Sequence, residues 1–355
     1  MQTVALFPIQ KTKHSKLHEV DINNAPFGKV FSDHILIADY VEGKWRDARI
    51  VPYGDITISP ATSALHYGQS IFEGLKADRH INGKNICLFR PEANFLRMNI
   101  SAERMCMPSI TEEIFIGGIR ELLNLDRDWV PTSQGCSLYI RPFMFATDPY
   151  IGMKPSQTYK FMIFTSPVGA YYSAPVKVKV EQHYTRAVKG GTGYAKFSGN
   201  YAASMYPTKL AAQQGYDQII WTDGQTHQFI EEAGTMNIMF VIDGKLITPA
   251  TGDSILKGVT RDSVLTIARQ WGMTVEERPV PVAEVIDAIK TKRLQEAFGA
   301  GTAATIAHIS VIGHEGVDYT LPPIHEREFS NKVYRELYDI KHGIKPDPYG
   351  WVHVL

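Results

Sequence analysis

The chain has few of the features that place a protein in a specialised class. Lys and Arg together number 37, as do Asp and Glu, so no net field favours nucleic acid or an anionic membrane as a partner. No window approaches the roughly 18 unbroken apolar residues of a membrane span. The sequence shows no internal repeat and no low-complexity segment. The chain has three cysteines, Cys87, Cys106 and Cys136, which are too few for a disulfide framework and share no metal-ligand spacing. We therefore expect no metal site, and we expect reduced, buried thiols in a cytoplasmic protein.

The rest of the composition is that of an ordinary globular protein. Apolar residues make up 44% of the chain and charged residues 21%. The first stretch, MQTVALFPIQKTKHSKL, has no long apolar segment and no Arg/Ser-rich amphipathic pattern, so it predicts neither a signal peptide nor a transit peptide. A length of 355 residues suffices for two domains with separate cores.

Strand and helix patterns alternate with hairpin signals in both halves of the chain, which predicts an α+β fold. Residues 167–176, rich in Pro, Gly and small residues, are the best candidate for an interdomain linker. We therefore expect an α+β domain over 1–166 and a second over 177–355. The first half predicts a hairpin over 31–52 turning at Glu42-Gly43, helices opening at Pro91 and Thr111, and strands over 136–146 and 159–168. The second half predicts strands over 176–182 and 218–224 and a hairpin over 237–249 that turns at Asp243-Gly244. It also predicts a helix capped by Thr260 and closed by Gly272, and a helix over 282–292. Residues 294–310 contain two apolar runs around a Gly-rich turn.

One lysine differs from the others in its surroundings. Lys189, Lys209 and Lys257 lie in polar settings, whereas Lys196 lies in GGTGYAKFSGNY, which is small and apolar. Partial desolvation would lower the pKa of its amine, and a neutral amine is what attacks an aldehyde. The alternative from composition alone is an ordinary loop lysine.

Glu232 follows the strand-like HQFI and precedes an Ala-Gly-Thr turn, so its carboxylate could be buried at a strand end. Such an acid can keep a pyridine nitrogen protonated and make the ring an electron sink. The alternative is an exposed loop carboxylate, which is our expectation for Glu231. Two backbone segments could also bind anions. The first is Gly258-Val259-Thr260, for which the alternative is a plain helix N-cap. The second is Gly299-Ala300-Gly301-Thr302-Ala303-Ala304, for which the alternative is an ordinary Gly-rich turn.

At this point the sequence resembles the branched-chain amino acid aminotransferases, of the pyridoxal phosphate (PLP) fold-type IV family. The match spans nearly the whole chain, and its motifs occur in family order: FGKVFSDHILIADY, LHYGQSIFEGLKA, LFRPEANFLRM, LYIRPFMFATDP, VGAYY, KFSGNY, EEAGTMNI, GVTRDS and GTAATI. The resemblance implies the two-domain fold of that family, with PLP as cofactor and the PLP lysine in the 177–355 domain.

The resemblance also implies a role for individual residues. Lys196 would form the Schiff base with PLP and later move the proton at the substrate Cα. Tyr201 would bond the phenolic oxygen of the cofactor, and Glu232 the pyridinium. The phosphate would be held by Arg97 with the amides of Val259 and Thr260. The substrate carboxylate would meet Thr235, Thr302 and Ala303, and the side-chain pocket would be lined by Phe27, Tyr67, Phe72, Tyr139 and Met153.

Arg141 follows the strand SLYI, where a charge needs a partner. A pocket that accepts both a leucine-like side chain and the γ-carboxylate of glutamate could use an arginine at its rim. The alternative is a structural salt bridge. One departure from some animal members is the lack of a Cys-x-x-Cys after Gly-Thr-Ala, so we expect no thiol redox switch there.

The resemblance implies reversible transfer of the amino group of leucine, isoleucine or valine to 2-oxoglutarate, so the partners are amino acids and 2-oxo acids. Members of the family are typically homodimers or larger, and we expect a homodimer. A D-amino acid aminotransferase and an aminodeoxychorismate lyase share the lysine and the acid, but we associate FGKVFSDH and LHYGQSIFEG with the branched-chain group. A catalytically silent PLP-fold protein should lack Lys196, Tyr201 or Glu232, and all three are present.

Overall fold

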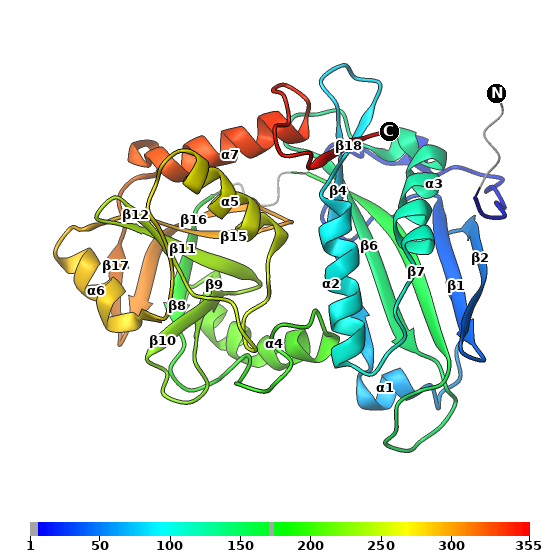
Figure 1. The fold of residues 1–355 in the computed structure, drawn as a ribbon, viewed down its shortest axis with the longest axis horizontal. Helices are drawn as coiled ribbons and strands as arrows, with labels where there is room; N and C mark the ends of the chain where they lie inside the picture. Colours follow the sequence, from blue (N-terminus) through cyan, green and yellow to red (C-terminus); the bar gives the residue numbers. More distant parts are fainter. Residues whose placement is uncertain (1–5, 170–173) are drawn as a thin grey trace. The chain divides into compact units, whose positions relative to one another are not determined.

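The computed structural model describes residues 6–169 and 174–355, which divide into two compact units (Figure 1). The first unit comprises Met1–Tyr171, Ala195–Ser198 and Asp339–Leu355, and the second comprises Tyr172–Tyr194 and Gly199–Tyr338. Within the described ranges, no helix combines the length and apolar character needed to cross a membrane.

This division differs from the expected continuous domains. The short segment around Lys196 belongs to the first unit, because Phe197 bridges Ile71 and the amide of Phe72 donates to the Lys196 carbonyl at 3.0 Å. The C-terminal segment joins the same unit through strand pairing of Val352–Val354 with Ile86–Phe89. The sequence could not reveal these pairings, because their partners are far apart in the chain. Of the expected linker over 167–176, residues 170–173 lie outside the described residues, Pro167 and Val168 end a strand, and Val176 begins one.

The first unit is a twisted sheet of eight strands, counted over the described residues, in the order β18-β5-β4-β6-β7-β1-β2 with β3 beside β6. All of its pairings are antiparallel. The strands are β1 (His34–Val41), β2 (Lys44–Pro52), β3 (Ser70–Phe72), β4 (Leu75–Arg79), β5 (Ile86–Phe89), β6 (Ser137–Ala146), β7 (Tyr159–Val168) and β18 (Val352–Val354).

Helices α2 (Pro91–Arg104) and α3 (Gly118–Leu125) cover one face of this sheet (Figure 1). Their apolar side chains, such as Met98 and Leu122, join sheet residues such as Leu138 in one buried core. That burial is the main source of stability for a helix on a sheet. The shorter helical segments are η1 (Leu17–Glu19), α1 (Ser63–Tyr67), the π-helical η2 (Glu113–Gly117) and η3 (Arg127–Trp129).

The second unit contains ten strands over its described residues, and six of them close into a ring. The ring runs β11-β15-β16-β8-β9-β10, because β10 pairs with both β9 and β11. Closure removes the sheet edges that would otherwise expose unpaired backbone groups. The strands are β8 (Val176–Val180), β9 (Gln218–Thr222), β10 (Phe229–Ala233), β11 (Met236–Ile242), β12 (Lys245–Thr248), β13 (Val275–Glu277), β14 (Val280–Pro281), β15 (Leu294–Gly301), β16 (Thr305–His314) and β17 (Val317–Thr320).

The barrel interior is filled by branched side chains such as Val178, Ile220 and Ile238. Figure 1 shows α5 (Val259–Gln270) and α6 (Val282–Lys290) outside the strands. The remaining helices are α4 (Ser198–Gln213), α7 (Glu328–Lys341) and η4 (Ile324–Glu326). The mixture of helices with largely antiparallel sheets confirms the predicted α+β class.

Both predicted two-residue hairpin turns are confirmed. Val41 pairs with Lys44 around a turn in which Glu42 and Gly43 have φ of 52° and 75°. Asp243 and Gly244 have φ of 51° and 71° and likewise connect β11 to β12. Two successive positive φ values characterise the type I′ turn, which matches the twist of paired strands.

The helix starts were predicted less accurately. Pro91 occupies the first turn of α2 as expected. Thr111 accepts the N–H of Ile114 on its hydroxyl at 3.3 Å, as a cap does. The prediction for Thr260 is wrong, because Gly258 is the N-cap residue of α5 and Thr260 lies inside the helix. A glycine was passed over because Ser, Thr, Asp and Asn are the stronger caps.

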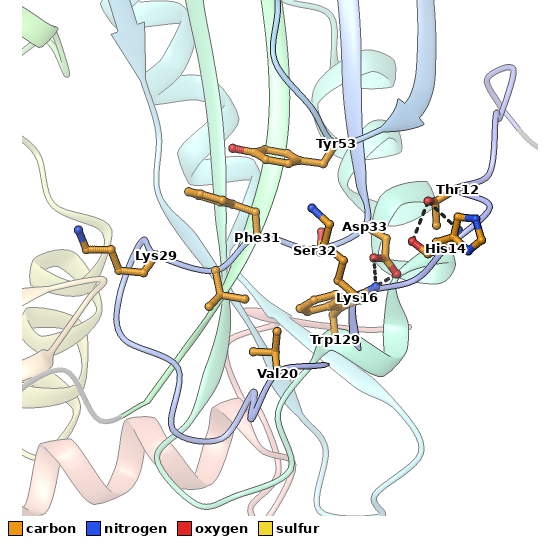
Figure 2. Close-up of a pocket in the computed structure, with 11 residues that line it drawn as sticks. Thr12, His14, Lys16, Val20, Lys29, Phe31, Ser32, Asp33, Tyr53 and Trp129 are labelled. Carbon is orange, nitrogen blue, oxygen red and sulfur yellow. Dashed lines mark hydrogen bonds between the residues drawn. The ribbon is translucent and has the colours of Figure 1, made fainter. Parts of the chain in front are cut away.

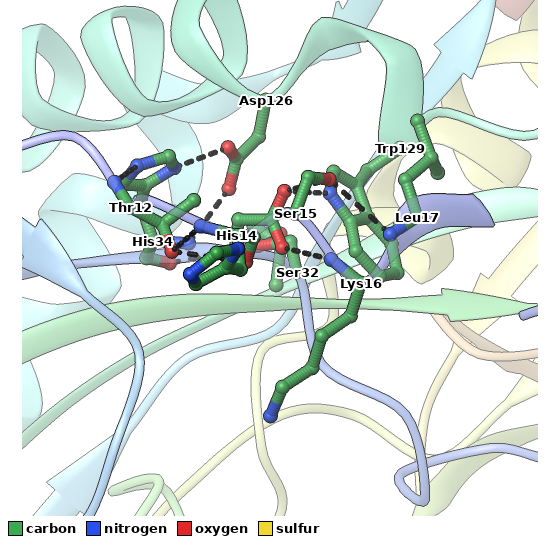
Figure 3. Close-up of polar contacts among 11 residues, drawn as sticks. Thr12, His14, Ser15, Lys16, Leu17, Ser32, His34, Asp126 and Trp129 are labelled. Carbon is green, nitrogen blue, oxygen red and sulfur yellow. Dashed lines mark hydrogen bonds and ion pairs between the residues drawn. The ribbon is translucent and has the colours of Figure 1, made fainter. Parts of the chain in front are cut away.

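The N-terminal segment is attached to the first unit through Asp33 and His34 (Figure 3). Nε2 of His34 accepts the N–H of Thr12 at 2.9 Å, so its other nitrogen, Nδ1, carries the proton that faces Asp126 Oδ1 at 2.6 Å. The backbone N–H of His34 donates to the other oxygen of Asp126 at 3.0 Å. Asp33 accepts from the hydroxyl of Ser15, the amide of Lys16 and the indole of Trp129.

Replacing Asp126 by alanine is expected to destabilise the first unit. The change leaves two buried donors of His34 without an acceptor, at a cost of about 1–3 kcal/mol each. Thermal or urea unfolding should show the loss. Asp128→Ala, a change of the same kind in the neighbouring η3, serves as the control and should have little effect. Equal stability of the two variants would mean that the His34–Asp126 pair does not hold this region together.

Candidate active site

Lys196 lies just before α4 and is fixed through its backbone. Its N–H donates to the hydroxyl of Ser101 on α2 at 2.9 Å, and its carbonyl accepts the N–H of Phe72 on β3. The amine Nζ lies 4.7 Å from the ring centroid of Phe72. Lys196 is half-buried, its backbone N–H and carbonyl are both hydrogen-bonded, and its amine lies against an aromatic ring.

Arg141 lies against the same ring. Its guanidinium carbon is 4.6 Å from the centroid of Phe72 and 5.3 Å from that of Tyr139, and Nη2 donates to the Tyr139 hydroxyl at 3.1 Å. Nε of Arg141 is buried without a hydrogen-bond partner among the described residues. The predicted residues Phe72, Tyr139, Arg141 and Lys196 thus form one cluster, whose unsatisfied Arg141 donor suits an anionic group.

Arg97, the predicted phosphate ligand, is buried on α2 and pairs with Glu73. Nε lies 2.7 Å from Oε1 and Nη2 lies 2.8 Å from Oε2, which is the bidentate geometry of a strong charge-assisted contact. Asn94 also donates to Glu73 at 2.7 Å. Burial by itself raises the pKa of Glu73, but Arg97, followed by Lys196 and Asn94, holds that pKa below its ordinary value. Glu73 therefore stays ionised and fixes the orientation of the Arg97 fork.

In the second unit, Glu232 is buried on β10, and its partners include Arg186, Leu256 and Asn237. Oε2 lies 2.9 Å from Nη2 of Arg186, and Oε1 accepts the N–H of Leu256 at 2.9 Å. Nδ2 of Asn237, its cross-strand partner on β11, lies 3.4 Å from Oε1. A carboxylate with these donors is favoured over a neutral acid, which suits contact with a cationic ring nitrogen.

The expectation that Glu231 is exposed is wrong, since only 8% of its surface is accessible. Glu231 falls at a register shift between Ile230 and Glu232, which marks a bulge in β10, and both acids are buried. Oε1 of Glu231 accepts the Ser254 hydroxyl, and burial raises the pKa of Glu231.

Asn237 connects Glu232 to the segment that precedes helix α5. Besides facing Glu232, its Nδ2 donates to the Leu256 carbonyl at 2.9 Å, two residues before the α5 N-cap. A Cβ on Gly258 would lie 2.0 Å from Oδ1 of Asn237, so only glycine fits there. Because Gly258 has no side chain to cap the helix, the first turn, with Val259 and Thr260, can receive an anion instead.

Two turns lie at the same end of the barrel. Gly234-Thr235 joins β10 to β11, and Thr302-Ala303-Ala304 joins β15 to β16. Since Asn237 pairs with Ala300 in antiparallel register, the start of β11 is beside the end of β15. Glu232, Thr235, Thr302 and Ala303 are thereby brought together. Tyr201 is half-buried in the first turn of α4.

Three predicted pocket residues are more exposed than the others. Phe27 packs edge-on against Tyr139, with ring centroids 5.0 Å apart, and is 39% exposed. Tyr67 at the end of α1 is 42% exposed, and Met153 in the β6–β7 connection is 94% exposed. Phe27 thus joins the cluster around Phe72, whereas no contact within the described part of the first unit brings Met153 to it.

The first unit also has a cavity of about 270 Å³ beside the N-terminal segment (Figure 2). It contains none of the predicted site residues, and the acid in its wall, Asp33, is already bonded to Ser15, Lys16 and Trp129. A hollow of about 590 Å³ elsewhere in this unit includes Phe27 and Cys136 in its lining. All three cysteines are free, and Cys106 is exposed, contrary to the expectation that all are buried. Over the described residues, no group of three or more His, Cys, Asp or Glu side chains could hold a metal ion.

Sequence reasoning missed three polar residues of this site: Glu73, Arg186 and Asn237. A signal existed for Glu73, a lone acid in the apolar run SIFEGL, because a charge in such a run needs a buried partner. Nothing local distinguishes Arg186 in HYTRAV from a surface arginine.

The chain is similar to known aminotransferases over nearly its whole length, in sequence and in structure. The model of the amino-transferase class IV family matches residues 70–312. "Branched-chain-amino-acid aminotransferase 2" of Bacillus subtilis is 44% identical over 345 residues, covering 95% of this chain and 94% of that protein. The branched-chain aminotransferase of Thermoproteus uzoniensis, solved with norvaline, has a TM-score of 0.74 at 25% identity and covers 90% of this chain and 99% of its own.

A further solved structure, the T.th. branched-chain amino acid aminotransferase complexed with N-(5'-phosphopyridoxyl)-L-glutamate, has a TM-score of 0.70 at 25% identity. The match covers 90% of this chain and 97% of that one. With a lysine–arginine cluster in one unit, a buried carboxylate in the other, and relatives similar from end to end, the chain belongs to the class IV amino-transferase family, among the branched-chain-amino-acid aminotransferases.

Proposed function

We propose that this protein transfers the amino group of leucine, isoleucine or valine to 2-oxoglutarate, with PLP as cofactor. The observation that carries the proposal is the sharing of one aromatic ring, Phe72, by the Lys196 amine and the Arg141 guanidinium. This pairing puts an amine for the aldehyde and a cation for a substrate carboxylate beside the same aromatic ring. The glutamate adduct of the T.th. relative is consistent with this chemistry.

The residues present fit the cofactor. Lys196 would hold its aldehyde, Glu232 its ring nitrogen, Tyr201 its phenolic oxygen, and Arg97 with the first turn of α5 its phosphate. When bound, PLP supplies an electron sink for the bonds at the substrate Cα. The glycine N-cap at Gly258 and the pairing of Glu232 with Arg186 are the features of this chain that support the assignment.

The proposed contribution of the protein is to hold groups and move protons. The Lys196 amine would take the proton from the substrate Cα and return it to the adjacent carbon of the cofactor. Thr235, Thr302 and Ala303 would bind the α-carboxylate at the barrel end. Phe27, Phe72 and Tyr139 would surround an apolar side chain, with Tyr67 and Met153 as further lining residues.

The apolar surface of the first unit supports a homodimer. Tyr67, Ile151 and Met153 are large, exposed side chains on α1 and the β6–β7 connection, which the Thr62–Pro149 bridge joins. Such a patch is typical of a surface covered by another protein, here a second copy. Light scattering on the purified protein tests this, and a monomer mass at working concentration would contradict it. The three free thiols support the prediction of a cytoplasmic protein.

A substrate panel tests the activity. Purified protein with PLP should convert L-leucine, L-isoleucine and L-valine with 2-oxoglutarate and should leave D-amino acids untouched. Turnover of D-alanine, or release of pyruvate from aminodeoxychorismate, would favour the related PLP enzymes instead.

Replacing Arg141 by methionine is expected to impair the half-reaction with glutamate more than that with leucine. Loss of a charge-assisted hydrogen bond to the γ-carboxylate costs on the order of 1.5–3 kcal/mol, so glutamate efficiency should fall roughly ten- to hundredfold. The two half-reactions can be followed separately by the change in the cofactor spectrum. Equal losses for both amino acids would mean that Arg141 only orders Tyr139 and Phe72.

A further inference from the structure

We propose that Arg186 is a positioning residue that keeps the shared proton on the ring nitrogen of the cofactor, by holding Glu232 as a carboxylate. The inference rests on the proposed function, in which Glu232 faces that nitrogen. It concerns a residue for which the sequence pattern suggested no role.

The two side chains form a buried pair inside the second unit. Nη2 of Arg186 is 2.9 Å from Oε2 of Glu232, and the side chains are 9% and 4% exposed. This pair is less exposed than the Arg278–Glu284 pair of the same unit, whose side chains are 33% and 28% exposed. A pair withdrawn from water is screened little by salt or solvent, so its charges act strongly on each other.

The backbone fixes the guanidinium independently of Glu232. Nη2 of Arg186 also donates to the carbonyl of Ser254 at 2.6 Å and to that of Gly193 at 3.2 Å. A Cβ on Gly193 would lie 2.4 Å from the Ser254 oxygen, so glycine is required for the two loops to approach. The positive charge is therefore held in place by backbone groups as well as by Glu232.

The neighbouring acid shows that the arrangement is selective. Glu231 is also buried, yet its bonded oxygen accepts the Ser254 hydroxyl, and Oε2 has no partner within the described residues. The direct contact of Arg186 is with Glu232 alone of the two. Arg186 thus pairs directly with only one of the two adjacent buried acids, while at Glu231 its charge is outweighed by burial, which raises the pKa of that acid.

The strength of the cofactor ring as an electron sink depends on whether the proton between its nitrogen and Glu232 is on the nitrogen or on the carboxylate. A ring nitrogen and a carboxylate that share a proton can exist as pyridinium with carboxylate or as pyridine with carboxylic acid. Arg186 stabilises the carboxylate, so the proton stays on nitrogen, and the ring remains the stronger electron sink. Without the positive charge, the proton moves from nitrogen to Glu232, and no other bond is made or broken.

The test measures the proton directly. PLP carrying ¹⁵N in its ring is bound to the wild-type protein and to the variants Arg186→Gln, Arg186→Lys and Glu232→Gln, and the ring ¹⁵N shift is recorded. We expect a protonated position for the wild type and Arg186→Lys, and a clear displacement toward the neutral-pyridine position for Arg186→Gln. Turnover of Arg186→Gln should fall on the order of tenfold or more, as for loss of one charge-assisted bond.

Arg278→Gln is the matched control, since it also removes a guanidinium that pairs with a glutamate in the second unit. It should leave the ¹⁵N shift unchanged. If Arg186→Gln keeps the protonated shift while Glu232→Gln loses it, the role of Arg186 is overturned and the proposed function stands. If the wild type binds no PLP, or if Glu232→Gln changes nothing, the proposed function itself fails. Should Arg186→Gln not fold, a wild-type shift in Arg186→Lys supports the proposal and a neutral shift refutes it.

Discussion

Replacing Lys196 by alanine is expected to abolish covalent attachment of PLP and nearly all turnover. The amine would serve both as the holder of the aldehyde and as the acid–base group at the substrate Cα, and loss of one such group typically costs about 10²–10⁴-fold in rate. The main chain at this position is bonded to Ser101 and Phe72, so truncating the side chain should leave the fold intact. The yellow colour of the loaded protein should therefore be lost or altered without a large change in thermal stability.

Borohydride reduction followed by peptide mapping gives the second readout. In the wild-type protein the reduced cofactor should be found on the peptide that contains Lys196, and in Lys196→Ala on none. Lys189→Ala is the control, because Lys189 is exposed in the same loop region. An adduct on Lys189, Lys209 or Lys257 in the wild-type protein would refute the assignment.

Replacing Glu232 by glutamine is expected to preserve much of the cofactor binding but to lower turnover at least about a hundredfold, as for removal of one preorganised electrostatic group. A neutral amide cannot hold the pyridinium proton. Both oxygens of Glu232 now face donors, Arg186 at 2.9 Å and the Leu256 N–H at 2.9 Å, so in either orientation of the amide its NH2 group would face another donor. Some loss of thermal stability should accompany the loss of rate.

Glu231→Gln separates these two effects. It changes the adjacent residue on the same strand by the same substitution, but Glu231 has a pKa raised by burial and no direct bond to Arg186. We expect near-wild-type turnover for this variant. If instead Glu231→Gln is the inactive one and Glu232→Gln keeps its rate, the ring nitrogen faces Glu231, and the two acids must exchange roles.

The sequence by itself determined the turns, one helix start, the family and several site residues, because each depends on residues that are close together in the chain. The hairpins at Glu42-Gly43 and Asp243-Gly244 follow from residues that tolerate positive φ, and the start of α2 follows from Pro91. The ordered family motifs, together with their agreement with relatives, determined the family. The family motifs also identified Lys196, Arg141 and Phe72, and in the first unit the two cations lie against the ring of Phe72.

Only the tertiary structure decided which charges meet. Glu73 and Arg97 are separated by 24 positions, and Arg186 lies far along the chain from Glu232, so no local pattern could pair them. The bulge that buries Glu231, the return of β18 to the first sheet and the closure of the barrel likewise depend on pairing between distant segments. A sequence reveals residues that need a partner when they are buried, because burying an unpaired charge is costly, but the partner is chosen by how distant strands and loops come together.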